Sequence, residues 1–236
     1  MKKRFLLLLP IFLLTTSCGH APSSSDLART QTKKSSRVHI AKRTKSVSMP
    51  KSKPLIVIDP GHGDHDGGAQ YHNSDEKQLN LITAQYVKKH LNSKGYRVLL
   101  TRNRDVFVPL IDRAILANRS KCEAFVSIHY NSAKSIKASG VEVYFYHKAQ
   151  KERLEDSKHL ASKVLDHIVH HTGAKKRGVK FANFCVIRET AMPAILVEGG
   201  FMTHPKESKL LKDSEYLDKL AKGIAEGVDK YFQTIR

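Results

Sequence analysis

The stretch DPGHGDHDGG, from Asp59 to Gly68, concentrates side chains that can bind metals or move protons. It contains two histidines, three aspartates and four glycines, and it directly follows the apolar run LIVI. Glycine has no Cβ, so a loop rich in glycine can bend a histidine towards a partner without steric conflict. We expect His62 to be the active histidine of this stretch and His65 to be a bystander.

Two further apolar runs end in a residue that can bind a metal ion or transfer a proton. AFVSIH closes on His129, and AILVE closes on Glu198. In open α/β sheets ligands bind beyond the carboxyl ends of the strands, so side chains at these ends are expected to meet. A single histidine of this kind is equally well explained by a hydrogen bond in the core. Three such strand ends together favour a shared site.

A catalytic zinc ion takes about three protein ligands from His, Asp or Glu and leaves one position for water. A nearby carboxylate then moves the proton while the ion polarises a carbonyl. We expect His62, Glu76 and His129 to bind one Zn²⁺ per chain, although a carboxylate at the start of a helix, such as Glu76, is also favourable on its own. Glu198 is the expected catalytic base. Asp59 is expected to accept a hydrogen bond from the second ring nitrogen of His62.

The elements that must position these residues alternate along the chain. Short β-branched runs predict strands at 55–59, 96–101, 124–129, 140–146, 185–188 and 194–198. Helical periodicity predicts helices at 76–94, 109–120, 150–172 and 215–231. This alternation predicts an α/β fold with a mostly parallel, twisted sheet flanked by helices and with the zinc site at the carboxyl ends of its strands.

Several spaced motifs also carry a family resemblance. They are DPGHGDHDGGA, the Glu76-Lys77 pair, TRNRDVFVPLIDRAILAN, SIHYNS, GVEVYFY and RGVKFANFCVIRETAMPAILVEGGF. In this order, between about Leu55 and Phe232, they resemble the zinc-dependent N-acetylmuramoyl-L-alanine amidases of bacterial cell walls, the amidase_3 family. The resemblance implies the same zinc ligands and the same catalytic glutamate. It also implies hydrolysis of the peptidoglycan amide that joins the lactyl group of N-acetylmuramic acid to L-alanine of the stem peptide.

Other residues receive secondary roles. Arg188 is a candidate for stabilising the oxyanion that develops during hydrolysis. Asn131 either binds substrate or braces its loop. Arg102 and Arg113 also match the family, and we assign them to structural salt bridges. Some amidases of this family carry a long helical insertion that blocks the site until an activator binds. The interval between His129 and Glu198 holds little beyond the expected elements, which predicts an enzyme without such a block.

The N-terminal part of the 236-residue chain has a different composition. Three positive charges and an apolar stretch from Phe5 to Leu14 predict an export signal over 1–18, with Cys18 in the position that bacterial lipoproteins lipidate. Residues 19–53 read as a flexible basic tether, with nine Lys/Arg and no acid from Arg29 to Lys53. We expect an exported, periplasmic monomer, anchored to the membrane if Cys18 is lipidated. The net charge of +19 could suit binding to nucleic acid, but an exported protein does not meet nucleic acid, so we expect no such partner.

Residues 54–236 are then the catalytic domain, for which two other functions stay open. One is a penicillin-binding-type D,D-carboxypeptidase that uses the SxxK match at Ser74 and Lys77. The other is a catalytically silent protein that binds peptidoglycan. An oxidising compartment also leaves open a disulfide between Cys122 and Cys185.

Overall fold

The computed structural model describes residues 53–71 and 73–235. The predicted export signal, Cys18 and all of the tether except Lys53 lie outside these residues. Within them, no helix is both long and apolar enough to cross a membrane.

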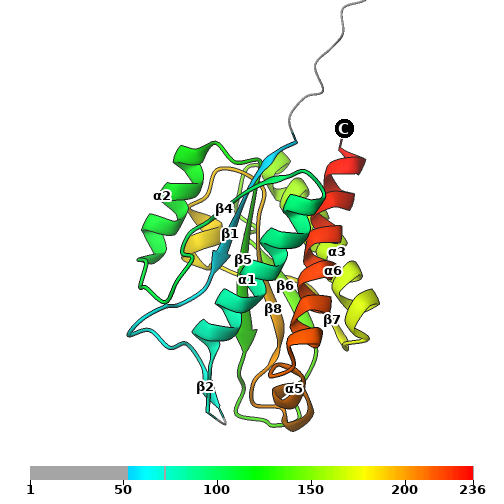
Figure 1. Ribbon diagram of the computed structural model, residues 1–236. Coiled ribbons are helices and arrows are strands. Elements are labelled where there is room, and N and C mark those ends of the chain that lie inside the picture. Colours follow the sequence, from blue (N-terminus) through cyan, green and yellow to red (C-terminus); the bar gives the residue numbers. More distant parts are fainter. Residues whose placement is uncertain (1–52, 72, 236) are drawn as a thin grey trace, which may run out of the picture. The chain divides into compact units, whose positions relative to one another are not determined.

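A six-stranded sheet forms the centre of the fold (Figure 1). In spatial order its strands are β4 (Arg97–Leu100), β1 (Leu55–Pro60), β5 (Ala124–Asn131), β8 (Ala194–Phe201), β6 (Val141–Phe145) and β7 (Lys176–Phe181). The first four are mutually parallel, while β6 runs antiparallel to β8 and parallel to β7. The predicted mostly parallel sheet is therefore confirmed, with one antiparallel junction.

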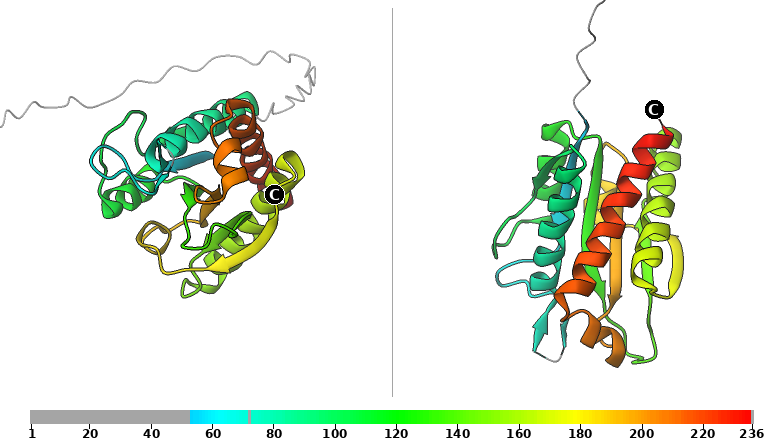
Figure 2. Two further views of the ribbon diagram at one scale, coloured as in Figure 1. Left: turned by 90° about the horizontal axis from the view of Figure 1, so that it is seen from below. Right: turned by 45° about the vertical axis from the view of Figure 1, so that its right-hand side comes forward.

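Helices pack on both faces of this sheet (Figure 2). One face carries α1 (Glu76–Ser93), α3 (Lys151–Thr172) and α6 (Ser214–Thr234); the other carries α2 (Leu110–Ser120) and α4 (Cys185–Arg188). Alternate residues of β1 divide between the two cores: Ile56 and Ile58 join the larger one, and Val57 the smaller. A short hairpin, β2 (Gln70–Tyr71) and β3 (Ser74–Asp75), precedes α1, and α5 (Pro205–Leu210) follows β8.

One predicted element was wrong, and one strand was not predicted. The segment 185–188, expected as a strand, is the helix α4. Val186 and Ile187 are consecutive residues of this segment, and both are buried in the same small core. In a strand, consecutive residues would point to opposite faces of the sheet. Strand β7 escaped prediction because KRGVKF is charged and contains glycine, a composition that an edge strand tolerates. In addition, β5 and β8 continue past His129 and Glu198.

The long helix α3 belongs to the core. It packs so closely along α6 that a Cβ added at Gly227 of α6 would lie 2.4 Å from Cα of Val164 on α3. Leu160 and Ile168 are also fully buried. This helix is the longest element between His129 and Glu198, and it is packed into the larger core.

A buried carboxylate ties β1 to its neighbours. Oδ1 of Asp59 accepts hydrogen bonds from Arg113 Nη1 at 2.9 Å and Thr101 Oγ1 at 2.6 Å, and Oδ2 accepts one from Ser127 Oγ at 2.8 Å. The side chains of Asp59 and Arg113 are only 1% and 2% exposed. A buried ion pair of this kind is sensitive to the loss of one partner, because the remaining charge keeps its desolvation cost. The salt bridge predicted for Arg113 is confirmed.

Asp59→Asn should therefore destabilise the fold strongly. It leaves the Arg113 guanidinium buried without its carboxylate, and we expect the free energy of unfolding to fall by about 3–5 kcal/mol. Urea unfolding of the metal-free protein measures the change. Glu215→Gln, which removes only the exposed pair with Lys219, is the control and should have a far smaller effect. A wild-type midpoint for Asp59→Asn would contradict the assignment.

Candidate active site

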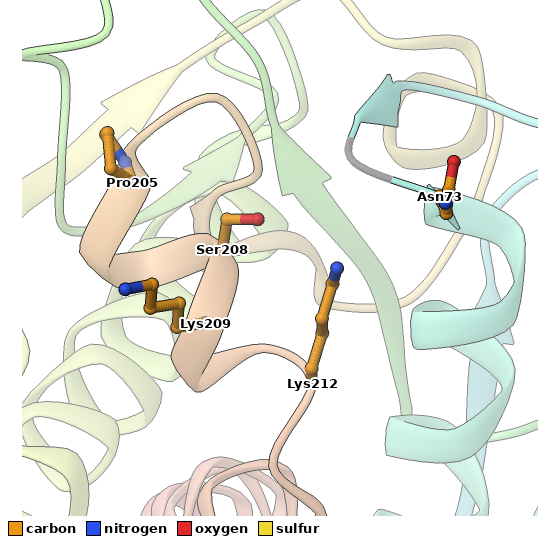
Figure 3. A pocket seen from close by; sticks show the side chains of 5 residues that line it. All are labelled: Asn73, Pro205, Ser208, Lys209 and Lys212. Carbon is orange, nitrogen blue, oxygen red and sulfur yellow. The ribbon is translucent and has the colours of Figure 1, made fainter.

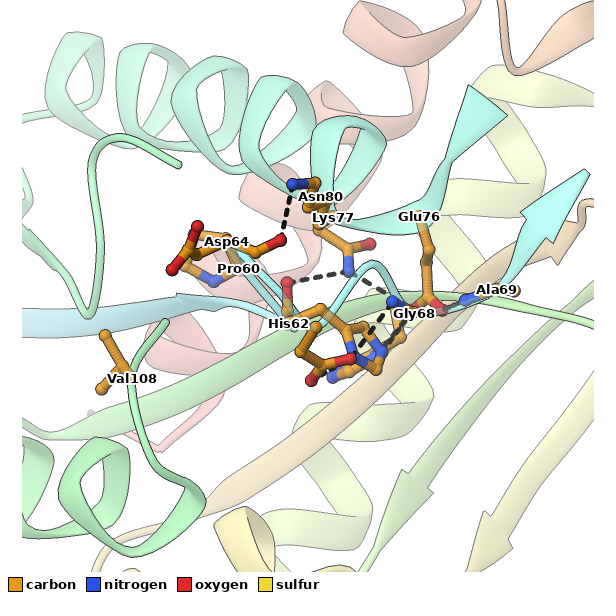
Figure 4. Close-up of polar contacts among 12 residues, drawn as sticks. Pro60, His62, Asp64, Gly68, Ala69, Glu76, Lys77, Asn80 and Val108 are labelled. Carbon is orange, nitrogen blue, oxygen red and sulfur yellow. Dashed lines mark hydrogen bonds and ion pairs between the residues drawn. The ribbon is translucent and has the colours of Figure 1, made fainter. Parts of the chain in front are cut away.

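Three potential metal ligands, His62, Glu76 and His129, converge at the carboxyl end of the sheet. Figure 4 shows the side chains of His62 and Glu76 close together. Oε1 of Glu76 lies 3.2 Å from Nε2 of His62 and 2.9 Å from Nδ1 of His129. One ligand atom from each of the three residues lies within 4.8 Å of the others. The sequence prediction brought together the same three residues, from the loop after β1, the first turn of α1 and the end of β5.

Glu76 is fixed by the backbone around it. Its Oε2 accepts a hydrogen bond from the Ala69 amide at 2.9 Å, and its Oε1 also accepts from the Tyr130 amide at 3.2 Å. Burial raises the pKa of Glu76, but hydrogen bonds from His129 and His62 outweigh this effect and hold the pKa well below its ordinary value. The carboxylate is therefore charged and ready to bind a cation.

His62 is held in an uncommon backbone conformation. Its φ is 61°, in the left-handed region, where residues other than glycine are few and tend to occur at functional sites. Its carbonyl accepts a hydrogen bond from Nη2 of Arg113 at 2.8 Å. The buried arginine thus holds the turn that presents the imidazole to Glu76.

Asp66, rather than Asp59, orients the ring of His62. Nδ1 of His62 lies 2.8 Å from Oδ2 of Asp66, whereas the carboxylate of Asp59 is occupied by Arg113 and two hydroxyl groups. The prediction for Asp59 was therefore wrong, because its buried position at the end of β1 turns it towards the sheet. Burial lowers the pKa of His62, but the hydrogen bonds and negative charges of Glu76 and Asp66 outweigh burial, and the net shift is upward. Asp66 lies four residues after His62, a spacing that could have indicated the pair.

The residues present fit a metal ion. Two imidazoles and a carboxylate are the donors that zinc prefers. Glycines make the approach sterically feasible: a Cβ at position 61 would lie 2.1 Å from Cε1 of His129, and one at position 68 would lie 2.6 Å from Oε2 of Glu76. The site therefore suits a compact divalent cation.

Glu198 lies beside this cluster. It is the register partner of His129 across the parallel pair of β5 and β8. Its Oε2 is shielded from solvent and has no hydrogen-bond partner among the described residues. Burial, followed by the negative charges of Glu76 and Glu142, raises its pKa well above the ordinary value. A shielded carboxyl oxygen without a partner is costly in a fold, which favours a catalytic use.

A cavity of about 260 Å³ opens next to the two histidines. Phe107, Val108 and Leu110 form an apolar wall on the side of α2. A separate cavity of about 470 Å³ is lined by Asn73, Pro205, Ser208, Lys209 and Lys212 (Figure 3). The two cavities share no lining residue, and only the smaller one is lined by candidate metal ligands.

The secondary candidates have structural partners. Nδ2 of Asn131 donates to Oε1 of Glu142 at 2.9 Å. Of the two roles expected for Asn131, this contact corresponds to bracing the loop. Arg188, on α4, donates to Glu189 and Asn183. Arg102 is structural as expected, but within the described residues it donates to carbonyls, including that of Gly61, and makes no ion pair.

The SxxK alternative and the cysteine pair find no support. Nζ of Lys77 donates to the Asp64 carbonyl at 2.7 Å and to Oδ2 of Asp105 at 2.8 Å, so the ammonium braces the loop after β1. Cys122 and Cys185 are both free.

Comparisons with known proteins agree with this geometry. Residues 56–230 match the model of the family described as N-acetylmuramoyl-L-alanine amidase. The chain is 37% identical to the N-acetylmuramoyl-L-alanine amidase LytC of Bacillus subtilis over 178 residues, which cover 75% of this chain and 35% of LytC. It therefore spans about a third of that relative.

Two solved structures match over nearly their whole length. The N-acetylmuramoyl-L-alanine amidase from Clostridium difficile 630 is 40% identical with a TM-score of 0.73, and the match covers 78% of this chain and 98% of that one. For the amidase AmiC2 of Nostoc punctiforme the values are 38% identity, a TM-score of 0.71, and 76% and 97% coverage. The chain thus belongs to the amidase_3 family of N-acetylmuramoyl-L-alanine amidases.

Proposed function

We propose that this protein is a zinc-dependent amidase that hydrolyses the bond between N-acetylmuramic acid and L-alanine in peptidoglycan. The observation that carries the proposal is the convergence of His62, Glu76 and His129 beside the unpartnered carboxyl group of Glu198. Membership of the amidase family supplies the substrate class. The proposed cofactor is one zinc ion held by the three converging residues.

Each protein group has a distinct part in this reaction. When bound, zinc supplies Lewis acidity towards a carbonyl oxygen and towards water. Glu198 accepts the proton of the attacking water and delivers it to the leaving nitrogen of L-alanine, as a general base and then a general acid. Burial raises the pKa of Glu198, which makes its carboxylate a stronger proton acceptor than an ordinary glutamate.

The structure favours this function over the two alternatives. A serine mechanism at Ser74 needs a lysine that is free to activate the hydroxyl, but Lys77 is committed to Asp64 and Asp105. A silent peptidoglycan-binding protein has no need of a shielded carboxyl oxygen without a partner, such as Oε2 of Glu198, beside a ligand cluster. We also propose that no activator is needed to displace an inserted helix, since α3 is packed into the core.

The N-terminal sequence supports a proposal for the site of action. We propose export through the signal at 1–18, action in the periplasm, and anchoring if Cys18 is lipidated. The basic tether would then hold the catalytic domain near anionic headgroups or acidic wall polymers. For Arg188 we retain a contribution to oxyanion stabilisation as a proposal.

Zinc titration of the metal-free protein tests the ligand assignment. We expect one tight site per chain by isothermal titration calorimetry, lost in His129→Ala because the cluster then keeps only two of its three ligands. Asp66→Ala should weaken zinc binding by about 10–100-fold, because the ring of His62 loses its orienting partner. His65→Ala is the matched control from the same loop and should bind zinc like the wild type. Unchanged affinity in His129→Ala would refute the site.

Glu198→Gln tests the proton transfer separately. We expect the rate of amide cleavage to fall by about 10²–10⁴-fold, because the amide side chain cannot accept a proton, while zinc binding is retained. Mass spectrometry of purified peptidoglycan would follow the release of free stem peptides, with and without a chelator. Glu215→Gln, an exposed glutamate on α6, should remain active. Release that survives both the chelator and the Glu198 substitution would contradict the mechanism.

A further inference from the structure

A second buried glutamate lies directly beside the catalytic candidate. Glu142 on β6 is the antiparallel register partner of Glu198 on β8, and it is only 2% exposed. Opposite residues of an antiparallel pair point to the same face of the sheet, with Cβ atoms roughly 5 Å apart. The surroundings of Glu142 therefore border the reaction site on the side away from β1.

The carboxylate of Glu142 forms ion pairs with two cationic side chains of the edge strand β7. Its Oε2 lies 2.7 Å from Nε of Arg177 and 2.5 Å from Nζ of Lys180, both on β7. Its Oε1 accepts hydrogen bonds from Asn131 at 2.9 Å and from the Tyr144 hydroxyl at 2.6 Å. One negative charge thus anchors two positive ones, and the cluster carries a net positive charge.

The two cations keep donors for a ligand. Their side chains are 29% and 38% exposed, although their partner carboxylate is buried. The guanidinium of Arg177 is fixed over the ring of Phe201, 4.8 Å from its centroid, and its acceptors among the described residues are Glu142 and Ser139. A guanidinium has five N–H donors and an ammonium has three, so both groups can donate hydrogen bonds to a further anionic partner.

The opposite side of the site differs in character. The cavity beside His62 and His129 has the apolar wall of Phe107, Val108 and Leu110, and the arginine among its lining residues, Arg113, is bound to Asp59. A free carboxylate is poorly solvated against apolar side chains. A substrate with one uncharged and one anionic end is therefore expected to place its anionic end towards β7.

Spacing identifies the part of the substrate concerned. Neighbouring strands are roughly 4.8 Å apart, so the cationic groups gathered on Glu142 lie about one strand spacing beyond Glu198. An extended chain advances roughly 3.3–3.6 Å per residue. A peptide whose scissile nitrogen lies at Glu198 would reach these cations with its next residue or the one after it.

We propose that Arg177 and Lys180 form a binding subsite for a free carboxylate on the peptide residue that follows L-alanine. This proposal rests on the amidase function and deepens it, because it fixes the direction of the substrate. The sugar lies towards the apolar cavity and the peptide runs towards β7. The enzyme thus prefers stem peptides with a carboxylate at this position over those with a carboxamide.

Two muramyl tripeptides that differ only in this group, carboxylate or carboxamide, provide the test. For the zinc-loaded wild type we expect kcat/KM to be about 10-fold or more higher for the carboxylate, the value of one hydrogen bond to a charged group. Lys180→Met and Arg177→Gln should lower kcat/KM for the carboxylate substrate, mainly through KM, and leave the carboxamide substrate nearly unchanged. Arg177→Lys should restore part of the preference.

Lys176→Met is the matched control. It removes a charge from the same strand, but Lys176 pairs with Asp166 rather than with Glu142, and the preference should persist. Equal cleavage of both substrates by the wild type, or equal losses on both in the variants, would overturn the subsite alone. Thermal unfolding identifies any variant that has lost its fold, and Lys180→Met and Arg177→Gln probe the subsite independently. Failure of the wild type to cleave either substrate would instead overturn the amidase function itself.

Discussion

The buried carboxylate of Asp59 is the interaction on which the site depends. It joins the end of β1 to α2 through Arg113, and to the neighbouring segments through Thr101 and Ser127. The same arginine donates to the carbonyls of Pro60 and His62. One ion pair, hidden from water, therefore fixes both the exit of the strand and the strained turn after it.

Around this anchor, the site gathers three carboxyl groups in different electrostatic environments. Glu76 receives hydrogen bonds from both histidines, and its pKa is depressed. Glu198 has a buried oxygen without a partner, and its pKa is raised. Glu142 is satisfied by four donors, two of them cationic. Burial raises the pKa of all three groups, so the neighbours separate a group suited to binding a cation from one suited to holding a proton.

The sheet order explains how these groups come to lie side by side. Strands β1, β5, β8, β6 and β7 are neighbours in that order. His62 follows the end of β1, while His129, Glu198 and Glu142 are successive register partners across β5, β8 and β6. Lys180 on β7 reaches Glu142 with its ammonium group. The antiparallel entry of β6 aligns Glu142 with Glu198, and the parallel addition of β7 brings the cations alongside. The site is thus a row across the sheet, with apolar side chains at one end and positive charges at the other.

The sequence by itself determined the fold class and the ligand set. Apolar runs that end in His, His and Glu, together with the glycines around His62, predicted a site at the carboxyl ends of parallel strands, and the motif order predicted the family. These features are local, since a strand end and a glycine turn are written in consecutive residues. Only the tertiary structure decided that Asp66 rather than Asp59 orients His62, that CVIR is a helix, and that Arg177 and Lys180 meet at Glu142. Each of these depends on which strand lies next to which and on which face of an element is buried. Residues far apart in the chain settle such questions by packing, which the pattern of a single segment does not contain.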